Sequence, residues 1–288
     1  MIRSFLLSEL AAVLKAQLIG PDRLISRVTT DSRQAAEGDL FVALIGDRFD
    51  AHDFIHNVAK AGAQAVVVSR PVNASVSQLI VDDTRLALAN LGGFNRSLFQ
   101  GDVVAVTGSA GKTSVKEMLA MMLNAYAPTL ATQGNLNNDI GAPLTLLDIE
   151  MNHRYAVVEL GASALGEIAH TVSITRPQVA ILNNALDAHI EGFGSLGNIV
   201  KAKSEIYEGL VDNGVGVVNL NDPHASVWIE KLHTLGRSVF TFGIETEATL
   251  SATHLKPDAH GCFSFELIID QTSYAVSLSV MGQHMVAN

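Results

Sequence analysis

Residues 103–114 read VVAVTGSAGKTS, an apolar β-branched run followed by glycines, a lysine and hydroxyl side chains. The apolar run predicts a buried strand, and residues 115–123 predict a helix. Between a strand and a helix, glycines let backbone amides approach phosphate oxygens, and the helix dipole favours the anion. The stretch therefore predicts an α/β fold with a phosphate-binding loop at one strand end.

The predicted phosphate loop is a short variant, because Val106 stands where the common pattern has a glycine six residues before the lysine. Lys112 can reach the β and γ phosphates of ATP, and the Thr113 hydroxyl can serve Mg²⁺. The alternative is an ordinary turn with a surface lysine, which the flanking strand and helix disfavour. The expected nucleotide contacts are Gly108, Ser109, Ala110, Gly111, Lys112, Thr113 and Ser114.

Downstream of the loop, apolar runs alternate with helical patterns. Buried strands are predicted at 155–159, 179–183 and 215–219. This alternation predicts a mainly parallel, doubly wound sheet. Residues 263–280 instead alternate apolar and polar side chains on both sides of a turn at 270–273. That pattern predicts an antiparallel hairpin appended to the parallel core.

The first 82 residues predict a small α/β domain of their own. Apolar residues recur at helical spacing from Leu6 to Leu18, which predicts an amphipathic first helix. Strands are expected at 39–45, 65–69 and 79–81, with a helix at 53–61. Residues 82–84 read DDT and can cap a helix that runs towards Arg96. We therefore predict two domains, 1–82 and 83–288.

Composition narrows the class of protein. Hydrophobic residues make up 48% of the 288 residues and charged residues 17%, which argues against disorder. The formal net charge of -10 would repel nucleic acid and anionic membranes. A single cysteine, Cys262, permits no internal disulfide, and no apolar run is long enough to span a membrane. We expect a cytoplasmic protein with no nucleic-acid or membrane partner.

Three polar residues near predicted strand ends are candidates for chemistry. Glu159 ends a predicted strand, at the edge where α/β proteins bind ligands, so it either holds Mg²⁺ or is a solvated acid. His189 lies in a loop and could be a metal ligand or contact a substrate, although most loop histidines do neither. Lys203 lies in a predicted helix, where a lysine is usually a solvated charge.

Two polar loops are further candidates. Asp31, Ser32 and Arg33 place a carboxylate, a hydroxyl and a guanidinium close together, and Arg33 could bind a diphosphate. The alternative is an exposed turn. Residues 134–141 read GNLNNDIG and could bind a polar ligand through their amides or satisfy only their own backbone.

Together these motifs resemble the Mur ligases, which build the peptide of bacterial peptidoglycan. The matching stretches cover the whole chain and are specific as a set: 30–33, 38–44, 46, 48–54, 107–116, 134–143, 159–162, 188–195 and 201–206. The resemblance implies an N-terminal domain that binds a UDP-linked substrate and a central ATP-binding domain. A third domain would follow residues 282–288, so we expect this chain to lack it and to be inactive alone.

The resemblance also implies a reaction. The carboxylate of a UDP-muramoyl peptide would attack the γ-phosphate of ATP, and an amine would displace phosphate from the resulting acyl phosphate. Residues 137–143 favour the family member that joins D-alanyl-D-alanine to UDP-N-acetylmuramoyl-tripeptide over the member that adds a diamino acid to make the tripeptide. Two rival hypotheses are a phosphate-loop kinase or nucleotidase, and a non-catalytic module that binds the nucleotide-linked precursor.

Residue roles follow from the resemblance. The catalytic residues would be Lys112, Glu159, His189 and Lys203. Of these, Glu159 with Thr113 would hold one Mg²⁺, and His189 with a carbamylated Lys203 would hold a second. The substrate would contact Asp31, Ser32, Arg33, Gly46, Phe49, Asp50 and His52 at its UDP end, and Asn137 and Asn138 nearer the muramoyl group. ATP and Mg²⁺ are the expected cofactors, and a monomer is expected.

Overall fold

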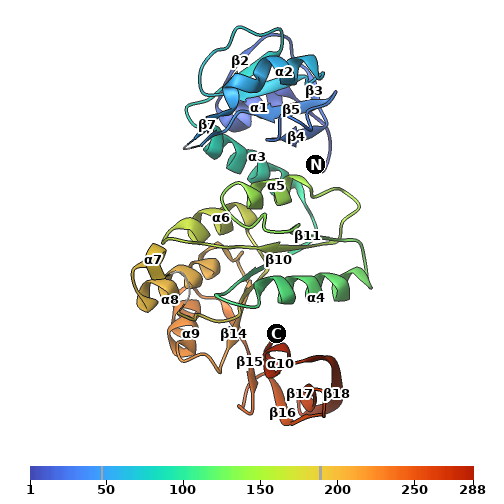
Figure 1. The fold of residues 1–288 in the computed structure, drawn as a ribbon, viewed down its shortest axis with the longest axis vertical. Helices are drawn as coiled ribbons and strands as arrows, with labels where there is room; N and C mark the ends of the chain where they lie inside the picture. The colour runs from blue at the N-terminus through green and yellow to red at the C-terminus, as the bar shows by residue number, and fades with distance from the viewer. Residues whose placement is uncertain (47, 188–189) are drawn as a thin grey trace. The chain divides into compact units, whose positions relative to one another are not determined.

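The computed structural model describes residues 1–46, 48–187 and 190–288 (Figure 1). Contacts divide the chain into two compact units. The N-terminal unit comprises Met1–Gly101 and Ala127–Ala156, and the central unit comprises Asp102–Tyr126 and Val157–Asn288. This division follows contacts rather than sequence pattern, and the domain limits 1–82 and 83–288 stay a prediction. No helix in the described ranges is long and apolar enough to cross a membrane.

The N-terminal unit is built on a five-stranded sheet. Its strands lie in the order β2 (Gln17–Ile19), β9 (Ser77–Ile80), β8 (Ala65–Val68), β5 (Asp39–Val42) and β4 (Arg27–Thr29). Only the pair β2 and β9 is antiparallel. The predicted strand at 39–45 is divided, because β5 ends at Val42 and Ile45–Gly46 (β6) pairs with Phe49–Asp50 (β7).

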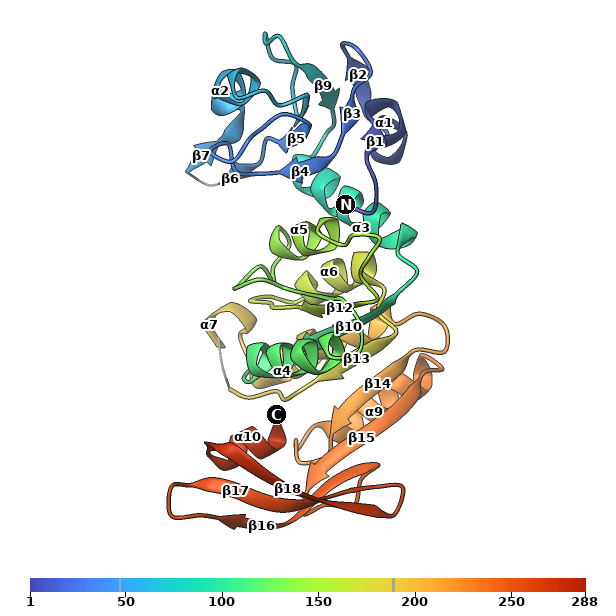
Figure 2. The ribbon, with the colours of Figure 1, turned by 90° about the vertical axis from the view of Figure 1, so that its right-hand side faces the viewer.

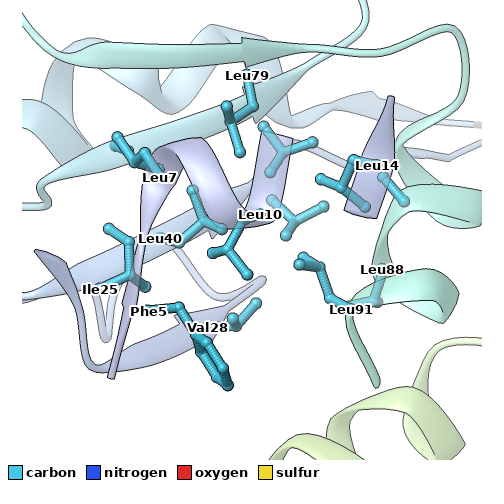
Figure 3. Packing of buried hydrophobic residues seen from close by; sticks show 14 of the residues in the cluster. Phe5, Leu7, Leu10, Leu14, Ile25, Val28, Leu40, Leu79, Leu88 and Leu91 are labelled. Carbon is cyan, nitrogen blue, oxygen red and sulfur yellow. The ribbon is translucent and has the colours of Figure 1, made fainter. Parts of the chain in front are cut away.

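Helices pack on this sheet over an apolar core. They are α1 (Leu7–Leu14), the 3-10 helix η1 (Ala51–Phe54), α2 (Ile55–Lys60), α3 (Thr84–Leu98) and α5 (Gly141–Leu147). The short strands β1 (Phe5–Leu6) and β3 (Leu24–Ile25) pair with each other. Figure 3 shows Leu7 and Leu10 of α1 among side chains from the sheet and from α3. Burying each such leucine contributes about 2 kcal/mol.

Two of these helices, α1 and α3, can be compared with the sequence predictions. The predicted first helix to Leu18 is too long, because Lys15 adopts a left-handed conformation (φ 53°) and ends α1, so that Leu18 lies in β2. The predicted helix after Asp83 is confirmed. The Asp83 carboxylate accepts hydrogen bonds from the backbone N–H groups of Arg85 and Leu86 at 2.7 and 3.1 Å, which caps α3.

The central unit contains a mixed sheet that is mainly parallel, as predicted (Figure 2). The strand order is β11 (Thr129–Ala131), β12 (Tyr155–Glu159), β10 (Asp102–Thr107), β13 (Val179–Leu182), β14 (Val215–Asn219), β15 (Ser238–Ile244), β16 (Leu250–Pro257), β17 (Cys262–Ile269) and β18 (Thr272–Met281). The pairings from β10 through β16 are parallel, and those among β16, β17 and β18 are antiparallel.

The helices of the central unit alternate with its parallel strands. They are α4 (Lys112–Asn124), α6 (Glu167–Thr175), α7 (Ile190–Phe193), α8 (Leu196–Ser204), the 3-10 helix η2 (Glu205–Gly209), α9 (Ala225–Thr234) and α10 (Gln283–Ala287). The predicted hairpin is confirmed as β17 and β18. Asp270 and Gln271 form its turn with positive φ angles of 47° and 64°, the conformation that matches the twist of paired strands.

Candidate active site

The phosphate loop lies between β10 and α4, as the sequence predicts. Gly111 caps α4 with φ 78°, a left-handed conformation that favours glycine. A Cβ atom at this position would also collide with the carboxamide of Asn183. Because α4 begins at the next residue, its first backbone N–H groups have no partner within the helix. The loop therefore provides the setting in which helix N-termini bind phosphate.

Lys112 folds back over this loop. Its Nζ donates a hydrogen bond to the Gly108 carbonyl oxygen at 2.8 Å. Burial lowers the pKa of Lys112, and the negative charge of Glu159 opposes that shift. Among the described residues Lys112 has no ion-pair partner, so a phosphate group would compensate a charge that the protein leaves unpaired.

Glu159 and Thr113 bring two oxygen donors together beside the loop. Glu159 ends β12 and is 1% exposed, and its Oε2 accepts a hydrogen bond from Thr113 Oγ1 at 2.9 Å. Adjacent ligands of an octahedral Mg²⁺ lie roughly 2.9 Å apart, because each ligand is about 2.05 Å from the ion. The two oxygen atoms are thus spaced as two adjacent ligands of a single Mg²⁺ ion would be. Since the described residues include no cluster of three or more His, Cys, Asp or Glu side chains, phosphate and water would complete the shell.

Lys203 is buried, so the ordinary interpretation of a helical lysine as a solvated charge is wrong here. The residue lies in the last turn of α8 and is 3% exposed. Burial lowers its pKa to about 8; the positive charge of Lys112 adds to this shift, whereas Glu167 and Glu205 oppose it. The Nζ lies 5.5 Å from the centre of the Phe193 ring. The electrostatic influence of Lys112 places Lys203 near the phosphate loop.

His189, the remaining predicted catalytic residue, lies outside the described residues, so its role stays a prediction. The described chain resumes with α7 (Ile190–Phe193). Ser114, the last predicted nucleotide contact, lies in the first turn of α4.

In the N-terminal unit, the predicted substrate residues 31–33 form a compact turn. The Asp31 carboxylate accepts hydrogen bonds from the backbone N–H and the guanidinium of Arg33 at 2.8 to 3.0 Å. The Arg33 guanidinium beside it holds the pKa of Asp31 well below its usual range. Arg33 is 86% exposed, so its charge is accessible to a ligand.

The second predicted substrate segment, 46–52, contains two kinds of residue. Phe49 is 56% exposed and lies against Gly46, where any side chain would collide with the ring. Asp50 and His52 instead have partners within the protein. Asp50 accepts from Arg70 Nη2 at 2.6 Å and lies 2.6 Å from His52 Nδ1. His52 joins η1 to the residue after β8 rather than exposing a polar atom, because its buried Nε2 accepts from the Ser69 backbone N–H at 3.0 Å.

In the 134–141 loop, Asn138 satisfies the local backbone. Its Oδ1 accepts hydrogen bonds from the N–H groups of Ile140 and Gly141 at 3.2 and 2.9 Å, at the start of α5. Asp139 forms an ion pair with Arg85 at 2.8 Å. Asn137 is half-buried beside them. The loop is therefore held by Asn138 from within and by the ion pair of Asp139 to α3.

Comparison with known proteins agrees with this geometry. A model described as "Mur ligase middle domain" matches residues 106–288, and one described as "Mur ligase family, catalytic domain" matches residues 24–120. The chain belongs to the Mur ligase family.

Curated relatives and solved structures of this family extend the comparison. The UDP-N-acetylmuramoyl-tripeptide–D-alanyl-D-alanine ligase of Escherichia coli is 46% identical over 287 residues. The match covers 99% of this chain and 63% of that relative, so the chain spans less than two thirds of its length. A crystal structure of MurF from Acinetobacter baumannii has a TM-score of 0.94 at 40% identity and covers 99% of this chain and 63% of that one.

A Thermotoga maritima MurF structure in complex with ADP has a TM-score of 0.78 at 32% identity. That match covers 88% of this chain and 58% of the other. The relative with bound ADP thus has the same fold as the two units described here.

In this Mur ligase chain, two asparagines that the sequence analysis did not single out hold the phosphate loop. Asn184 Oδ1 accepts from the Ala110 backbone N–H at 2.9 Å. Asn183 Nδ2 and Asn184 Nδ2 both donate to the Ala110 carbonyl oxygen, at 2.9 and 3.1 Å. Ser109 Oγ donates to the Leu186 carbonyl oxygen at 3.1 Å and accepts from the Leu186 N–H at 3.0 Å. Two consecutive asparagines directly after a buried strand are the sequence feature from which these contacts to the phosphate loop could have been predicted.

Two residues at and after the end of β14 form hydrogen bonds to the backbone of the asparagine segment. Asn219 Nδ2 donates to the Asn183 carbonyl oxygen at 3.0 Å. Asp222 Oδ2 accepts from the Ala185 N–H at 2.8 Å. The ends of three neighbouring strands, β10, β13 and β14, are therefore joined at the edge where ligands bind in α/β sheets.

Proposed function

We propose that this chain is the substrate- and ATP-binding part of a ligase that joins D-alanyl-D-alanine to UDP-N-acetylmuramoyl-tripeptide. The observation that carries the proposal is the Thr113–Glu159 pair, 2.9 Å apart beside the phosphate loop. A relative at 46% identity bears the name of this activity, and another was crystallised with ADP. Because ATP and UDP-linked precursors are substrates of the cytoplasm, we place the reaction there.

The first step transfers the γ-phosphoryl group. The terminal carboxylate of the tripeptide attacks the γ-phosphorus; a carboxylate O–P bond forms, and the bond from the γ-phosphorus to the bridging oxygen of ADP breaks. Such transfer depends on positioning and charge neutralisation. Lys112 and the amides at the start of α4 would neutralise the phosphates. Thr113 and Glu159 would hold a Mg²⁺ ion, which supplies further positive charge to the γ-phosphate when bound.

The second step forms the amide. The amine of D-alanyl-D-alanine attacks the acyl phosphate carbon, the C–O bond to phosphate breaks, and the amine gives up a proton as phosphate leaves. The buried positive charge of Lys112 would stabilise the leaving phosphate as it stabilised the transferring group.

We propose carbamylation for Lys203. Only the neutral amine reacts with CO₂, and a pKa of about 8 leaves a substantial neutral fraction near neutral pH. The product would be an oxygen ligand in place of a cation, and together with His189 it would fit a second Mg²⁺. A ¹³C-bicarbonate NMR signal that disappears in Lys203→Met tests this. A spectrum without that signal contradicts it.

For the nucleotide-linked substrate, exposed residues are the better candidates. Arg33 would pair with the diphosphate, and Phe49 beside Gly46 would contact the UDP end. Ser32 lies between the paired residues of the same turn. Asp50 and His52 would shape the site for the UDP end through the hydrogen bonds that they form within the protein. Asn138, next to Asn137, would in the same way shape the site for the muramoyl group.

The deciding experiment measures phosphate release from ATP and Mg²⁺ with the precursor and with each acceptor. A chain of the relatives' full length should release phosphate only when UDP-muramoyl-tripeptide and D-alanyl-D-alanine are both present. Preference for a diamino acid and the dipeptide precursor would identify the tripeptide-forming reaction instead. Release with neither substrate would indicate a nucleotidase, and tight precursor binding without release would indicate a binding module.

We further propose that these 288 residues alone bind nucleotide without completing ligation, as a monomer. The support is that the chain spans 63% of the length of its ligase relative. Equal turnover by the 288-residue chain and by a longer chain would contradict this proposal. Sedimentation of the 288-residue chain would test the monomer.

A further inference from the structure

Glu205 is a buried acid that the proposed chemistry does not use. It is 6% exposed and begins η2, two residues after Lys203. Its carboxylate binds backbone rather than a basic side chain. The Gly166 N–H donates to its two oxygens at 2.8 and 3.1 Å, and the Ala169 N–H donates to Oε2 at 3.0 Å.

These N–H groups belong to the start of α6. Gly166 is the N-cap residue and Ala169 lies in the first turn, where backbone N–H groups have no acceptor within the helix. A carboxylate at this end also interacts favourably with the helix dipole. Glu205 therefore caps α6 from a different element, 36 to 39 residues away in the sequence.

Two other contacts hold η2 and the loop before α6 in place relative to α6. At the far end of η2, Gly209 approaches the backbone of Val172 so closely that a Cβ atom would lie 2.5 Å from its carbonyl oxygen. In the loop before α6, the Ser163 N–H donates to Glu167 Oε2 at 2.7 Å. The η2 segment thus meets α6 at both of its ends, and the loop that leads back to Glu159 is held by its own hydrogen bond.

We infer that Glu205 is a positioning residue that sets the place of Lys203 relative to Glu159. The loop at 160–166 connects Glu159 to α6, and Glu205 fastens the start of α6 to the turn that follows Lys203. Without the carboxylate, the N–H groups of Gly166 and Ala169 lose their acceptor, and the link between the two segments is cut. This inference deepens the proposed function and rests on the roles proposed for Lys203 and Glu159.

The test uses three variants of the 288-residue chain. Glu205→Ala removes every acceptor at the α6 end, whereas Glu205→Gln keeps one oxygen of similar reach. Glu208→Gln is the matched control, because Glu208 lies in the same η2 segment, is 46% exposed and pairs with Lys231 rather than with α6. Thermal unfolding checks that each variant folds, and ADP affinity checks the phosphate loop.

The readout is the ¹³C carbamate signal of Lys203 under labelled bicarbonate. We expect Glu205→Ala to lower carbamate occupancy at least fivefold and Glu205→Gln at least twofold, with ADP affinity within twofold of wild type. Glu208→Gln should match wild type. Wild-type occupancy in both Glu205 variants overturns the inference, and so does an equal loss in the Glu208 control. If Glu205→Ala does not fold, Glu205→Gln decides.

A wild-type chain without a carbamate signal would contradict the proposed role of Lys203 and leave the positioning claim to a second measurement. Lysine labelled with ¹³C at Cε gives separate resonances for Lys203 and Lys112, assigned by single substitutions. Glu205→Gln should shift the Lys203 resonance and leave the Lys112 resonance at its wild-type position. An unshifted Lys203 resonance overturns the inference whatever the carbamylation result.

Discussion

Charged residues are compensated differently in the two units. In the N-terminal unit, Asp50 is paired with Arg70 and His52 at 2.6 Å. In the central unit, Lys112 and Lys203 are largely buried, and neither has an ion-pair partner among the described residues. Paired charges hold loops together, whereas unpaired buried cations are costly to fold and are retained where a ligand compensates them.

The pKa directions express the same contrast. The guanidinium of Arg70 is the largest cause that lowers the pKa of Asp50 to about 2, so this carboxylate remains charged at all physiological pH values. Burial is the largest cause that lowers the pKa of Lys203 to about 8, so this lysine changes charge close to neutrality. A partner stabilises the charged form in the first case, and desolvation destabilises it in the second.

The largest expected effect is that of Lys112→Met. Removing the unpaired cation should weaken ADP binding by about 100-fold. In a chain of the relatives' full length it should lower ligation by a factor on the order of 10³, because the phosphates lose their main protein charge. Calorimetry and phosphate release measure the two effects. Lys256→Met, which removes an exposed lysine of β16, is the control and should leave both unchanged. Equal loss in both variants would show that Lys112 has no special role.

Lys203→Met should abolish ligation by a chain of the relatives' full length and raise the stability of the 288-residue chain. The unfolded chain binds more protons than the folded chain between about pH 8 and the ordinary lysine pKa of 10.5, so wild-type stability rises with pH in this window. Below about pH 8 the full cost of the buried charge applies, and the variant should gain roughly 1 to 3 kcal/mol there. Urea unfolding at pH 7 and pH 10 measures the difference, which should shrink at the higher pH. A variant less stable than wild type at pH 7 would contradict this account.

Glu159→Gln should separate metal dependence from nucleotide binding. Glutamine still accepts the Thr113 hydrogen bond but lacks the charge that would hold Mg²⁺. We expect the gain in ADP affinity that Mg²⁺ provides to be about tenfold smaller in the variant. This corresponds to a loss of about 1.4 kcal/mol in binding free energy. Affinity without Mg²⁺ should change little. If Mg²⁺ strengthens ADP binding equally in wild type and variant, Glu159 is not a ligand.

In the N-terminal unit, His52→Ala should act mainly on stability. The change leaves the half-buried Ser69 N–H without its acceptor, which costs about 1 to 3 kcal/mol. Urea unfolding measures this loss, and ADP affinity should remain at the wild-type value. A loss of ADP affinity without a loss of stability would contradict a purely structural role for His52.

The smallest structural effect is expected for Arg33→Ala. The Asp31–Arg33 ion pair is exposed, and such pairs contribute little to folding. The melting temperature should not change measurably, whereas affinity for the UDP-linked precursor should fall about tenfold if Arg33 meets the diphosphate. Arg23→Ala, another exposed arginine of this unit, is the control. Unchanged precursor affinity in Arg33→Ala would remove residue 33 from the substrate site.

Local patterns in the sequence were sufficient for most of the fold. The stretch at 103–114 predicted β10, the phosphate loop and α4, and the hairpin around Asp270 was predicted from alternation alone. The first helix was overextended, because helical spacing through Leu18 gave no sign that Lys15 would adopt a left-handed conformation. Strands β15 and β16, which join the hairpin to the sheet, were not predicted, and neither were β2 and β4 of the N-terminal sheet.

The candidate site could be predicted only in part. The phosphate loop follows from adjacent residues, whereas the partners of Ala110 lie 73 and 74 residues away in the sequence. Burial of Lys203 depends on elements that only the folded chain brings together, and the sequence alone favoured a solvated lysine. Contacts over such separations carry no local signal, so Asn183, Asn184 and Glu205 required the structure.

The most direct test of the account follows one oxygen atom. A chain of the relatives' full length is supplied with ATP, D-alanyl-D-alanine and UDP-muramoyl-tripeptide labelled with ¹⁸O in its terminal carboxylate. The account predicts ADP as product and transfer of one ¹⁸O into the released phosphate, because the carboxylate oxygen becomes the bridge of the acyl phosphate. Amide formation with unlabelled phosphate would contradict it.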